Sequence, residues 1–75
     1  MNKERRRQIS EVASTISACV TTLESVRDAE YEAQENTPEN FQSGDVYCTS
    51  ERCSDTIEDV IPDLQEIVKQ LEEIT

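Results

Sequence analysis

Apolar residues recur along this chain in two stripes that a polar segment separates. Successive positions of the first stripe, from Ile9 to Val26, are three and four residues apart, and the second, from Ile57 to Ile74, has the same spacing. A helix turns once in 3.6 residues, so this alternation places the stripe along one side of a helix. The sequence predicts two amphipathic helices that pack through Ile9, Val12, Ile16, Leu23, Val26, Ile57, Val60, Leu64, Ile67, Leu71 and Ile74.

The segment between the stripes is rich in residues that favour turns and caps. We predict one domain, 1–75, made of a helix at 3–34, a connection at 35–49 and a helix at 50–75. Thr49 or Ser50 suits the N-cap of the second helix, because a side-chain oxygen there accepts a backbone N–H bond. Thr37, followed by proline, predicts one short helical turn within the connection.

Three further residues of the connection and one proline affect how the helices are expected to end. Phe41, Val46 and Tyr47 are expected to fold back over the end of the two helices as packing residues. Pro62 lies inside the second stripe, where proline removes one helical hydrogen bond. The stripe keeps its phase across Pro62, which favours a bent continuous helix; the alternative is a separate helix that ends near Ile61.

The two stripes match when the helices run antiparallel. If Ala33 lies near Ser50, Leu23 faces Val60 and every other apolar position also finds an apolar partner. The predicted fold class is therefore all-α, an antiparallel two-helix hairpin with coiled-coil-like packing. The same alignment predicts cross-helix pairing of the basic segment 5–7 with the acidic pair 72–73.

Additional apolar residues widen each stripe beyond what one partner helix covers. They occupy the position after one of the stripe positions, at Ala13, Val20, Ile61 and Val68. Two hairpins that share this surface would form a four-helix bundle. We therefore expect a homo-oligomer; the alternative is that a different protein covers this surface.

The chain is strongly acidic, with 17 acidic and 7 basic residues and a formal net charge of −10. Such a balance excludes direct binding to nucleic acid, which needs a basic face, and docking on an anionic membrane. The expected partner is a protein with a basic surface; the alternative is that the acidity serves solubility alone. The candidate partner-binding residues of the second helix are Glu51, Asp55, Glu58, Asp59, Asp63, Glu66 and Glu73.

Localisation follows from the N-terminal pattern and the cysteines. The basic segment 3–7 is followed by polar residues rather than by an apolar run of signal-peptide length. Cys19, Cys48 and Cys53 form an odd set, which is most simply three free thiols, with a Cys48–Cys53 redox pair as the alternative. We expect a soluble cytoplasmic protein, and an inert Cys19 within the stripe.

Residues for catalysis or for holding a cofactor are missing from the sequence. It contains no histidine, so a paired base for a nucleophile and a four-ligand zinc site are both excluded. A single glycine, Gly44, does not supply a phosphate-binding loop. We therefore expect a binding protein with no enzymatic activity, no metal and no cofactor.

The order of the segments resembles a group of very small proteins encoded by phages and prophages of Gram-positive bacteria. The resemblance covers nearly the whole chain and is carried by Lys3-Glu4-Arg5-Arg6-Arg7, Arg27-Asp28-Ala29-Glu30, Pro38-Glu39-Asn40-Phe41-Gln42-Ser43, Ser50-Glu51-Arg52 and Leu71-Glu72-Glu73-Ile74. The central turn is its most specific part. Pro62 and the cysteines depart from the pattern, and the group has no settled activity to carry over.

The resemblance implies a context, the cytoplasm of an infected host cell, and a mode of action. Small acidic phage proteins often bind a host protein stoichiometrically, and their targets include CRISPR effectors, other defence proteins and nucleic-acid enzymes. The leading hypothesis is an inhibitor or modulator of such a host protein that acts by occlusion. One alternative is a structural, self-assembling bundle or assembly factor, and another is an antitoxin-like partner of a basic protein.

Overall fold

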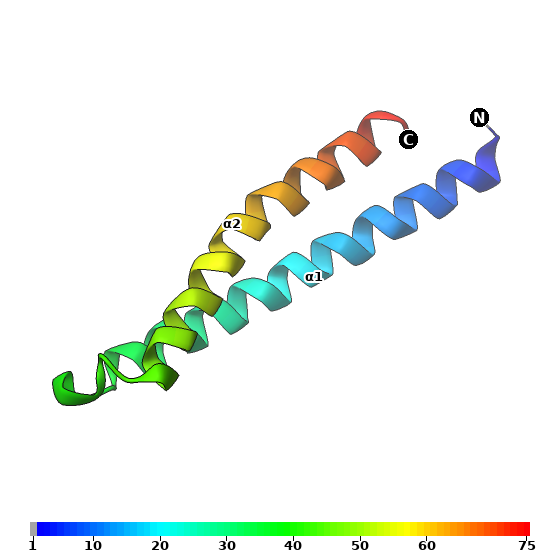
Figure 1. Ribbon diagram of the computed structural model, residues 1–75. Helices are drawn as coiled ribbons and strands as arrows, with labels where there is room; N and C mark the ends of the chain where they lie inside the picture. Colours follow the sequence, from blue (N-terminus) through cyan, green and yellow to red (C-terminus); the bar gives the residue numbers. More distant parts are fainter. Residues whose placement is uncertain (1) are drawn as a thin grey trace.

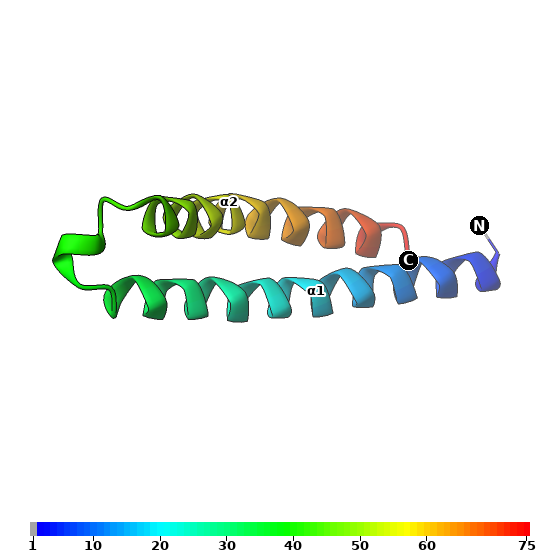
Figure 2. The same ribbon diagram turned by 60° about the horizontal axis from the view of Figure 1, so that its bottom comes forward.

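In the computed structural model, which describes residues 2–75, the chain is an antiparallel helical hairpin. Its elements are α1 (Lys3–Glu35), the short 3-10 helix η1 (Glu39–Phe41) and α2 (Asp45–Glu73). Figures 1 and 2 show α1 and α2 side by side, with η1 at one end of the rod and both chain ends at the other. The Cα positions extend over 59 × 14 × 14 Å. The predicted all-α two-helix hairpin is confirmed.

α1 begins at the predicted residue and carries its own cap. Asn2 is the N-cap, and its side-chain oxygen accepts a hydrogen bond of 2.8 Å from the backbone N–H of Arg5. Arg7 pairs with Glu4 and Glu11, one turn away on either side. The expected pairing of segment 5–7 with 72–73 is wrong, because within residues 2–75 no ion pair joins the two. Carboxylates on the same helix are nearer to Arg7 and satisfy its guanidinium.

α2 begins at Asp45, five residues before the predicted start at Ser50. Gly44 is the N-cap without a side-chain hydrogen bond, and the acidic Asp45 stands in the first turn, where the helix dipole favours it. Neither Thr49 nor Ser50 is a cap, since both lie within the helix. The Ser50 hydroxyl instead donates a hydrogen bond to the Glu30 carboxylate of α1. A polar residue that read as a cap is thus a contact between the helices.

Pro62 lies inside an unbroken α2 and is exposed to solvent. The axis of α2 changes direction in the part of Figure 1 that precedes Pro62. Proline bends a helix in this way because its ring displaces the carbonyl four residues earlier. The prediction of a bent but continuous helix is confirmed, and the alternative of a helix that ends near Ile61 is wrong.

The helices pack through a surface rotated by one position from the predicted seam. The most buried apolar residues are Ala13, Val20, Ile57, Ile61 and Val68, each 9% exposed or less. In α1 the covered positions alternate by four and three: Ile9, Ala13, Ile16, Val20, Leu23, Arg27, Glu30 and Gln34. In α2 they are Ser50, Ser54, Ile57, Ile61, Leu64, Val68 and Leu71.

Four of the eleven residues of the predicted seam therefore lie outside the contact between the helices. Ile9, Ile16, Leu23, Ile57, Val60, Leu64 and Leu71 are buried or half-buried, as predicted. Val12, Val26, Ile67 and Ile74 are 41–53% exposed, so their assignment to the contact between α1 and α2 is wrong. The positions that seemed only to widen the stripes form the centre of the contact.

The rotation has a physical reason in the residues near the connection. Arg27, Glu30 and Gln34 continue the covered side of α1, and they find polar partners on α2 at Glu58, Ser50 and Ser54. Packing on the rotated side lets these groups satisfy one another, which buried polar groups require. Small side chains at Ala13 and Ser54 also let the helices approach.

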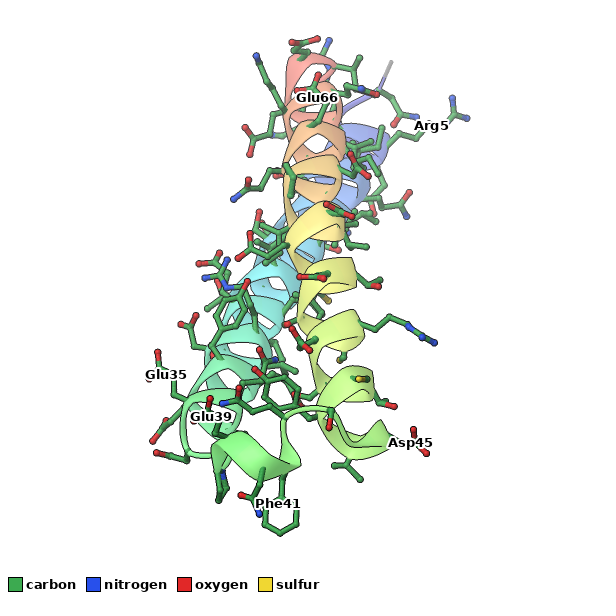
Figure 3. The ribbon with its side chains drawn as sticks, turned by 60° about the vertical axis from the view of Figure 1, so that its left-hand side comes forward. Arg5, Glu35, Glu39, Phe41, Asp45 and Glu66 are labelled. Atoms are coloured by element: carbon green, nitrogen blue, oxygen red, sulfur yellow. The ribbon has the colours of Figure 1, made fainter. Side chains whose placement is uncertain are left out.

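The connection forms the predicted short helical turn but does not cover the hairpin end. η1 starts after Pro38, which itself stands at the N-cap, whereas the Thr37 hydroxyl donates to the Ala33 carbonyl at 2.8 Å. Phe41 is 62% exposed and Val46 86% exposed, and only Tyr47 is half-buried. Figure 3 shows Phe41 at the tip, away from the helices. The expectation that all three fold back is wrong for Phe41 and Val46.

Candidate protein-binding surfaces

The hairpin has two unlike broad sides, which the cross-helix contacts identify. On one side the Tyr31 hydroxyl donates to Glu58 at 3.1 Å, and a groove joins Ser17 and Glu24 to Gln65. The residues one place after Ile16, Leu23, Ile57 and Leu64 are polar on both helices. In an antiparallel pair these residues lie on one side of the rod. The residues one place before Ala13, Val20, Ile61 and Val68 lie on the other side.

That other side is apolar, and we call it the apolar face. It consists of Val12, Cys19, Val26, Cys53, Val60, Ile67 and Ile74. Val60 is half-buried, and the other six are exposed. Aliphatic residues from both helices are thus uncovered along one side of the rod. An uncovered apolar patch of this length is typical of a protein–protein contact.

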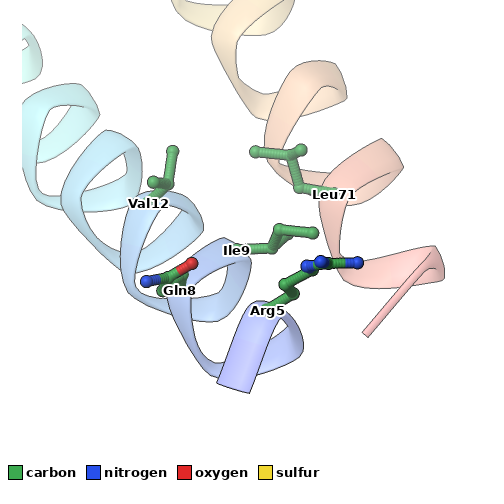
Figure 4. Close-up of a pocket in the computed structure, with 5 residues that line it drawn as sticks. All are labelled: Arg5, Gln8, Ile9, Val12 and Leu71. Atoms are coloured by element: carbon green, nitrogen blue, oxygen red, sulfur yellow. The ribbon is translucent and has the colours of Figure 1, made fainter. Parts of the chain in front are cut away.

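Shallow grooves follow the apolar face. One of about 320 Å³ lies between the helices near the chain ends and is lined by Arg5, Gln8, Ile9, Val12 and Leu71. Figure 4 shows Val12, Ile9 and Leu71 converging there, with Arg5 at the margin. A second groove follows α1 past Cys19, and a third follows α2 past Cys53. Such grooves accept side chains from a helix laid against them.

The acidic surface is formed by the seven predicted residues of α2, Glu51, Asp55, Glu58, Asp59, Asp63, Glu66 and Glu73. All seven are exposed, and Figure 3 shows Glu66 pointing away from α1. Within residues 2–75 only Glu58 of the seven pairs with a cation, Arg27, at 3.2 Å. The other six carboxylates are therefore available to an external basic group.

Asp59, Glu66 and Glu73 form the outermost line of this surface. They are spaced by seven residues, two helical turns, and stand opposite the covered side of α2. Asp63 lies instead toward the rim of the apolar face. The candidate residues thus do not all share one side of α2. The line of Asp59, Glu66 and Glu73 lies away from the contact with α1.

A polar cluster near the connection joins the helices and was not predicted. The Gln34 amide donates to the hydroxyls of Ser50 and Ser54, both at 3.1 Å. The Ser54 hydroxyl donates to the Glu51 carbonyl at 3.0 Å, and Ser54 is only 1% exposed. The cluster fixes the pairing of the helices at this end. Its signal in the sequence is the four-three spacing of the covered positions, which continues through polar residues.

Arg27 and Tyr31 both hold the carboxylate of Glu58. Partial removal of Tyr31 from water and its hydrogen bond to Glu58 raise the pKa of the phenol above its ordinary value. The Arg27 guanidinium lies 3.2 Å from the same carboxylate. Glu58 therefore contributes to the hairpin as well as to the acidic surface.

The three cysteines are free thiols and all are exposed. The expectation that Cys19 is covered within the helix contact is wrong, because the contact is rotated away from it. Cys48 and Cys53 lie on one continuous helix, and five residues of helix turn their side chains roughly 140° apart. That divergence excludes a disulfide between them while α2 is intact.

Neither a cluster of metal ligands nor a membrane-spanning helix is found in residues 2–75. Within residues 2–75 no group of three or more Cys, Asp and Glu side chains is arranged to hold a metal ion. Over the same residues neither helix includes a stretch that is long and apolar enough to cross a bilayer. Comparison of the chain with models of protein families, with curated proteins and with solved structures gives no match.

Proposed function

We propose that this protein is a small acidic binding module, which inhibits or modulates a host protein by stoichiometric occlusion of a basic surface. The observation that supports the proposal is the acidic surface of α2, where six of seven carboxylates have no cation partner within residues 2–75. The partner would be a defence protein or a nucleic-acid-handling protein of the host cytoplasm, as in the anti-CRISPR type of phage inhibitor. Acidic side chains held on a rigid helix would match the positive potential of such a basic surface.

The spacing of the charges indicates how closely α2 imitates a nucleic-acid backbone. Glu51–Glu73 contains eight acidic and two basic residues, over about 33 Å of helix at 1.5 Å per residue. That is roughly one net charge per 5–6 Å, whereas duplex DNA has about one per 1.7 Å. A single hairpin thus presents a diluted phosphate-like line, which favours a basic protein patch over a close fit to a duplex-binding channel.

The test compares two charge reversals of equal size. In the first, Asp59, Glu66 and Glu73 are changed to lysine, since these three lie on the outermost line of α2. In the matched control, Glu32, Glu35 and Glu39 are changed to lysine near the connection. Glu58 is left intact because its reversal would also break contacts with Arg27 and Tyr31. Far-UV circular dichroism checks that both variants keep the helix content of the wild type.

The readout is stoichiometric capture of a basic protein from a Gram-positive bacterial lysate on immobilised chain. The wild type and the control variant should retain the same basic protein. The variant with lysine at Asp59, Glu66 and Glu73 should lose it. Retention should fall steeply as salt rises, because exposed charges are screened. The electrostatic mechanism would be refuted if the variant changed at Asp59, Glu66 and Glu73 still captured the protein, or if capture did not depend on salt.

A second candidate function, a self-assembling bundle or assembly factor, is favoured by a separate observation, the uncovered apolar face. Exposed aliphatic residues at Val12, Val26, Ile67 and Ile74 are 41–53% accessible in the isolated hairpin. A homo-oligomer such as a four-helix bundle would cover them. Sedimentation equilibrium of the purified chain tests this candidate, and a monomer at every concentration would exclude it.

A further inference from the structure

Charged residues are nearly missing from the apolar face and from the positions along its rim. The rim consists of Gln8, Thr15, Thr22, Ala29, Thr49, Thr56, Asp63 and Gln70. Face and rim together comprise fifteen positions, where the 32% charged content of the chain would place about five charges. They contain one, Asp63, although Arg5 and Arg52 border two of the grooves. The remaining carboxylates are distributed over the other sides of the rod, so this side is suited to a dry contact.

We propose that a second copy of this chain covers the apolar face, with the connections of both hairpins at the same end of a four-helix bundle. The proposal rests on the second candidate function, self-assembly, and specifies its surface and arrangement. It shares Asp63 with the acidic surface but leaves the outermost line, Asp59, Glu66 and Glu73, to the acidic target.

The size of the face matches what a stable dimer requires. Along α2, from Thr49 to Ile74, the face and its rim run for about 38 Å at 1.5 Å per residue. Two helices with axes 8–10 Å apart make it roughly 18 Å wide. Such a face is on the order of 700 Å² per copy, so a dimer would bury about 1,400 Å², within the usual range of stable interfaces.

The occupant is a second copy rather than a basic protein, because the face offers a basic partner only one carboxylate. A second copy brings the same aliphatic residues and the same rim, whose one charged residue is Asp63. The hairpin core is also small, since among residues 2–75 five apolar residues are buried to 9% exposure or less. A domain of this size generally needs further buried apolar surface to be stable, and a second face supplies it.

Asp63 decides between the two ways in which the faces can meet. The Gln34–Ser50 hydrogen bond sets the pairing of the helices, and in that pairing Thr22 of α1 lies level with Asp63 of α2, close to the middle of the face. With the connections at opposite ends, α2 packs on the partner's α2, and the two Asp63 carboxylates meet near the two-fold axis. Like charges placed opposite one another in an interface are strongly unfavourable.

With the connections at the same end, α1 packs on the α2 of the second copy. Asp63 then lies beside Thr22 of the other copy, whose hydroxyl donates to the Ala18 carbonyl at 3.2 Å within the hairpin and can rotate to donate to the carboxylate instead. Along the same rim Thr15 meets Gln70 and Ala29 meets Thr56, so no like charges oppose each other. The same-end arrangement therefore leaves the lone charge of the face with a donor.

The first test measures the dimer dissociation constant by sedimentation for two variants with equal added charge. Val26→Glu with Ile67→Glu places two carboxylates on each apolar face. The matched control, Ser17→Glu with Gln65→Glu, adds the same charges on the polar side of the same helices. The face variant should weaken dimerisation roughly 100-fold or more, because four carboxylates would be buried per dimer, while the control should remain a dimer.

Salt separates this proposal from that of the acidic target. Each copy has a formal net charge of −10, so screening by salt should strengthen self-association, whereas it should weaken binding to a basic protein. A monomeric wild type would exclude self-assembly as well as this face. A wild-type dimer that the face variant and the control weaken equally would overturn the face alone.

The second test determines the arrangement by disulfide cross-linking. In a Cys48→Ser, Cys53→Ser background, Cys19 is the only thiol. The same-end arrangement brings Cys19 near Ile67 of the second copy and keeps the two Cys19 residues apart. Oxidation should then give covalent dimers only after Ile67→Cys is added, and a Cys19→Ser control of that variant should give none. A Cys19–Cys19 dimer would overturn the same-end arrangement.

Discussion

The rotated contact between the helices makes opposite predictions for two isoleucines six residues apart on α2. Ile61 is 6% exposed and lies in the hairpin core, whereas Ile67 is 42% exposed and lies on the apolar face. The seam predicted from the sequence instead places Ile67 in the contact and Ile61 at its margin. Changing each to alanine removes the same three carbon atoms from the same helix, so the pair is internally matched.

The expected costs follow from burial. Ile61→Ala should lower the free energy of unfolding by about 3 kcal/mol, since a buried CH₂ contributes about 0.8 kcal/mol, a cavity adds to the loss and alanine returns about 0.4 kcal/mol in helix propensity. Ile67 is only partly removed from water, so Ile67→Ala should cost about 1 kcal/mol by the same arithmetic. A chain of 75 residues has roughly 4–11 kcal/mol of stability, so both variants should remain measurable.

The assay is urea unfolding followed by circular dichroism, at protein concentrations below the dimer dissociation constant. Repeating it at higher concentrations adds a second criterion, because covering of the apolar face makes the cost of Ile67→Ala grow with concentration. Equal costs for the two variants in dilute solution, or a larger cost for Ile67→Ala, would show that the helices pack through the three-four stripes. The rotated contact would then be wrong.

Three further changes test individual contacts of the hairpin. Gln34→Leu should cost about 1 kcal/mol, because it removes two hydrogen bonds to Ser50 and Ser54, and hydrogen exchange should speed up near the connection; unchanged exchange there would contradict a structural role for the cluster. Pro62→Ala should stabilise the chain by roughly 1–3 kcal/mol, since Pro62 is exposed within α2 and alanine restores a helical hydrogen bond, and a fall in thermal midpoint would refute this reasoning. The raised pKa of Tyr31 favours its protonated form in the folded state, so this contribution to stability is complete below the ordinary phenol pKa of 10.0 and is lost as the pH rises through the folded-state pKa. Unfolding titrations should therefore show a steeper loss of stability above this pH in the wild type than in Tyr31→Phe, and parallel curves would contradict it.

The acidic surface was predictable as a set of residues, and its exposure required only the assumption that charged side chains remain in water. Its division into parts was not predictable. Glu58 is held by Arg27 and Tyr31, whereas Asp59, Glu66 and Glu73 form a line of their own. The difference depends on which side of α2 faces α1. The residue types, all Asp or Glu, do not reveal that side.

The start of α2 and the polar cluster show why the connection was harder to predict than the helices. Ser50 suits an N-cap, yet its hydroxyl bonds Glu30 across the hairpin. A local preference for capping and a contact with a distant residue use the same hydroxyl group, and local pattern alone does not distinguish them.

The amino-acid sequence alone predicted two long helices, their antiparallel direction and a pairing with Ala33 near Ser50, and the observed Gln34–Ser50 hydrogen bond lies one residue from that position. These features follow from the apolar periodicity of each helix and from the short connection between them, and both can be identified in the sequence. Which edge of each broad apolar stripe the helices share depends on how the two helices pack together. Ala13, Val20, Ile61 and Val68 were available on one edge, and Val12, Val26, Ile67 and Ile74 on the other. The choice depended on polar partners near the connection that satisfy one another only when both helices are in place, and it left the second edge uncovered as the apolar face.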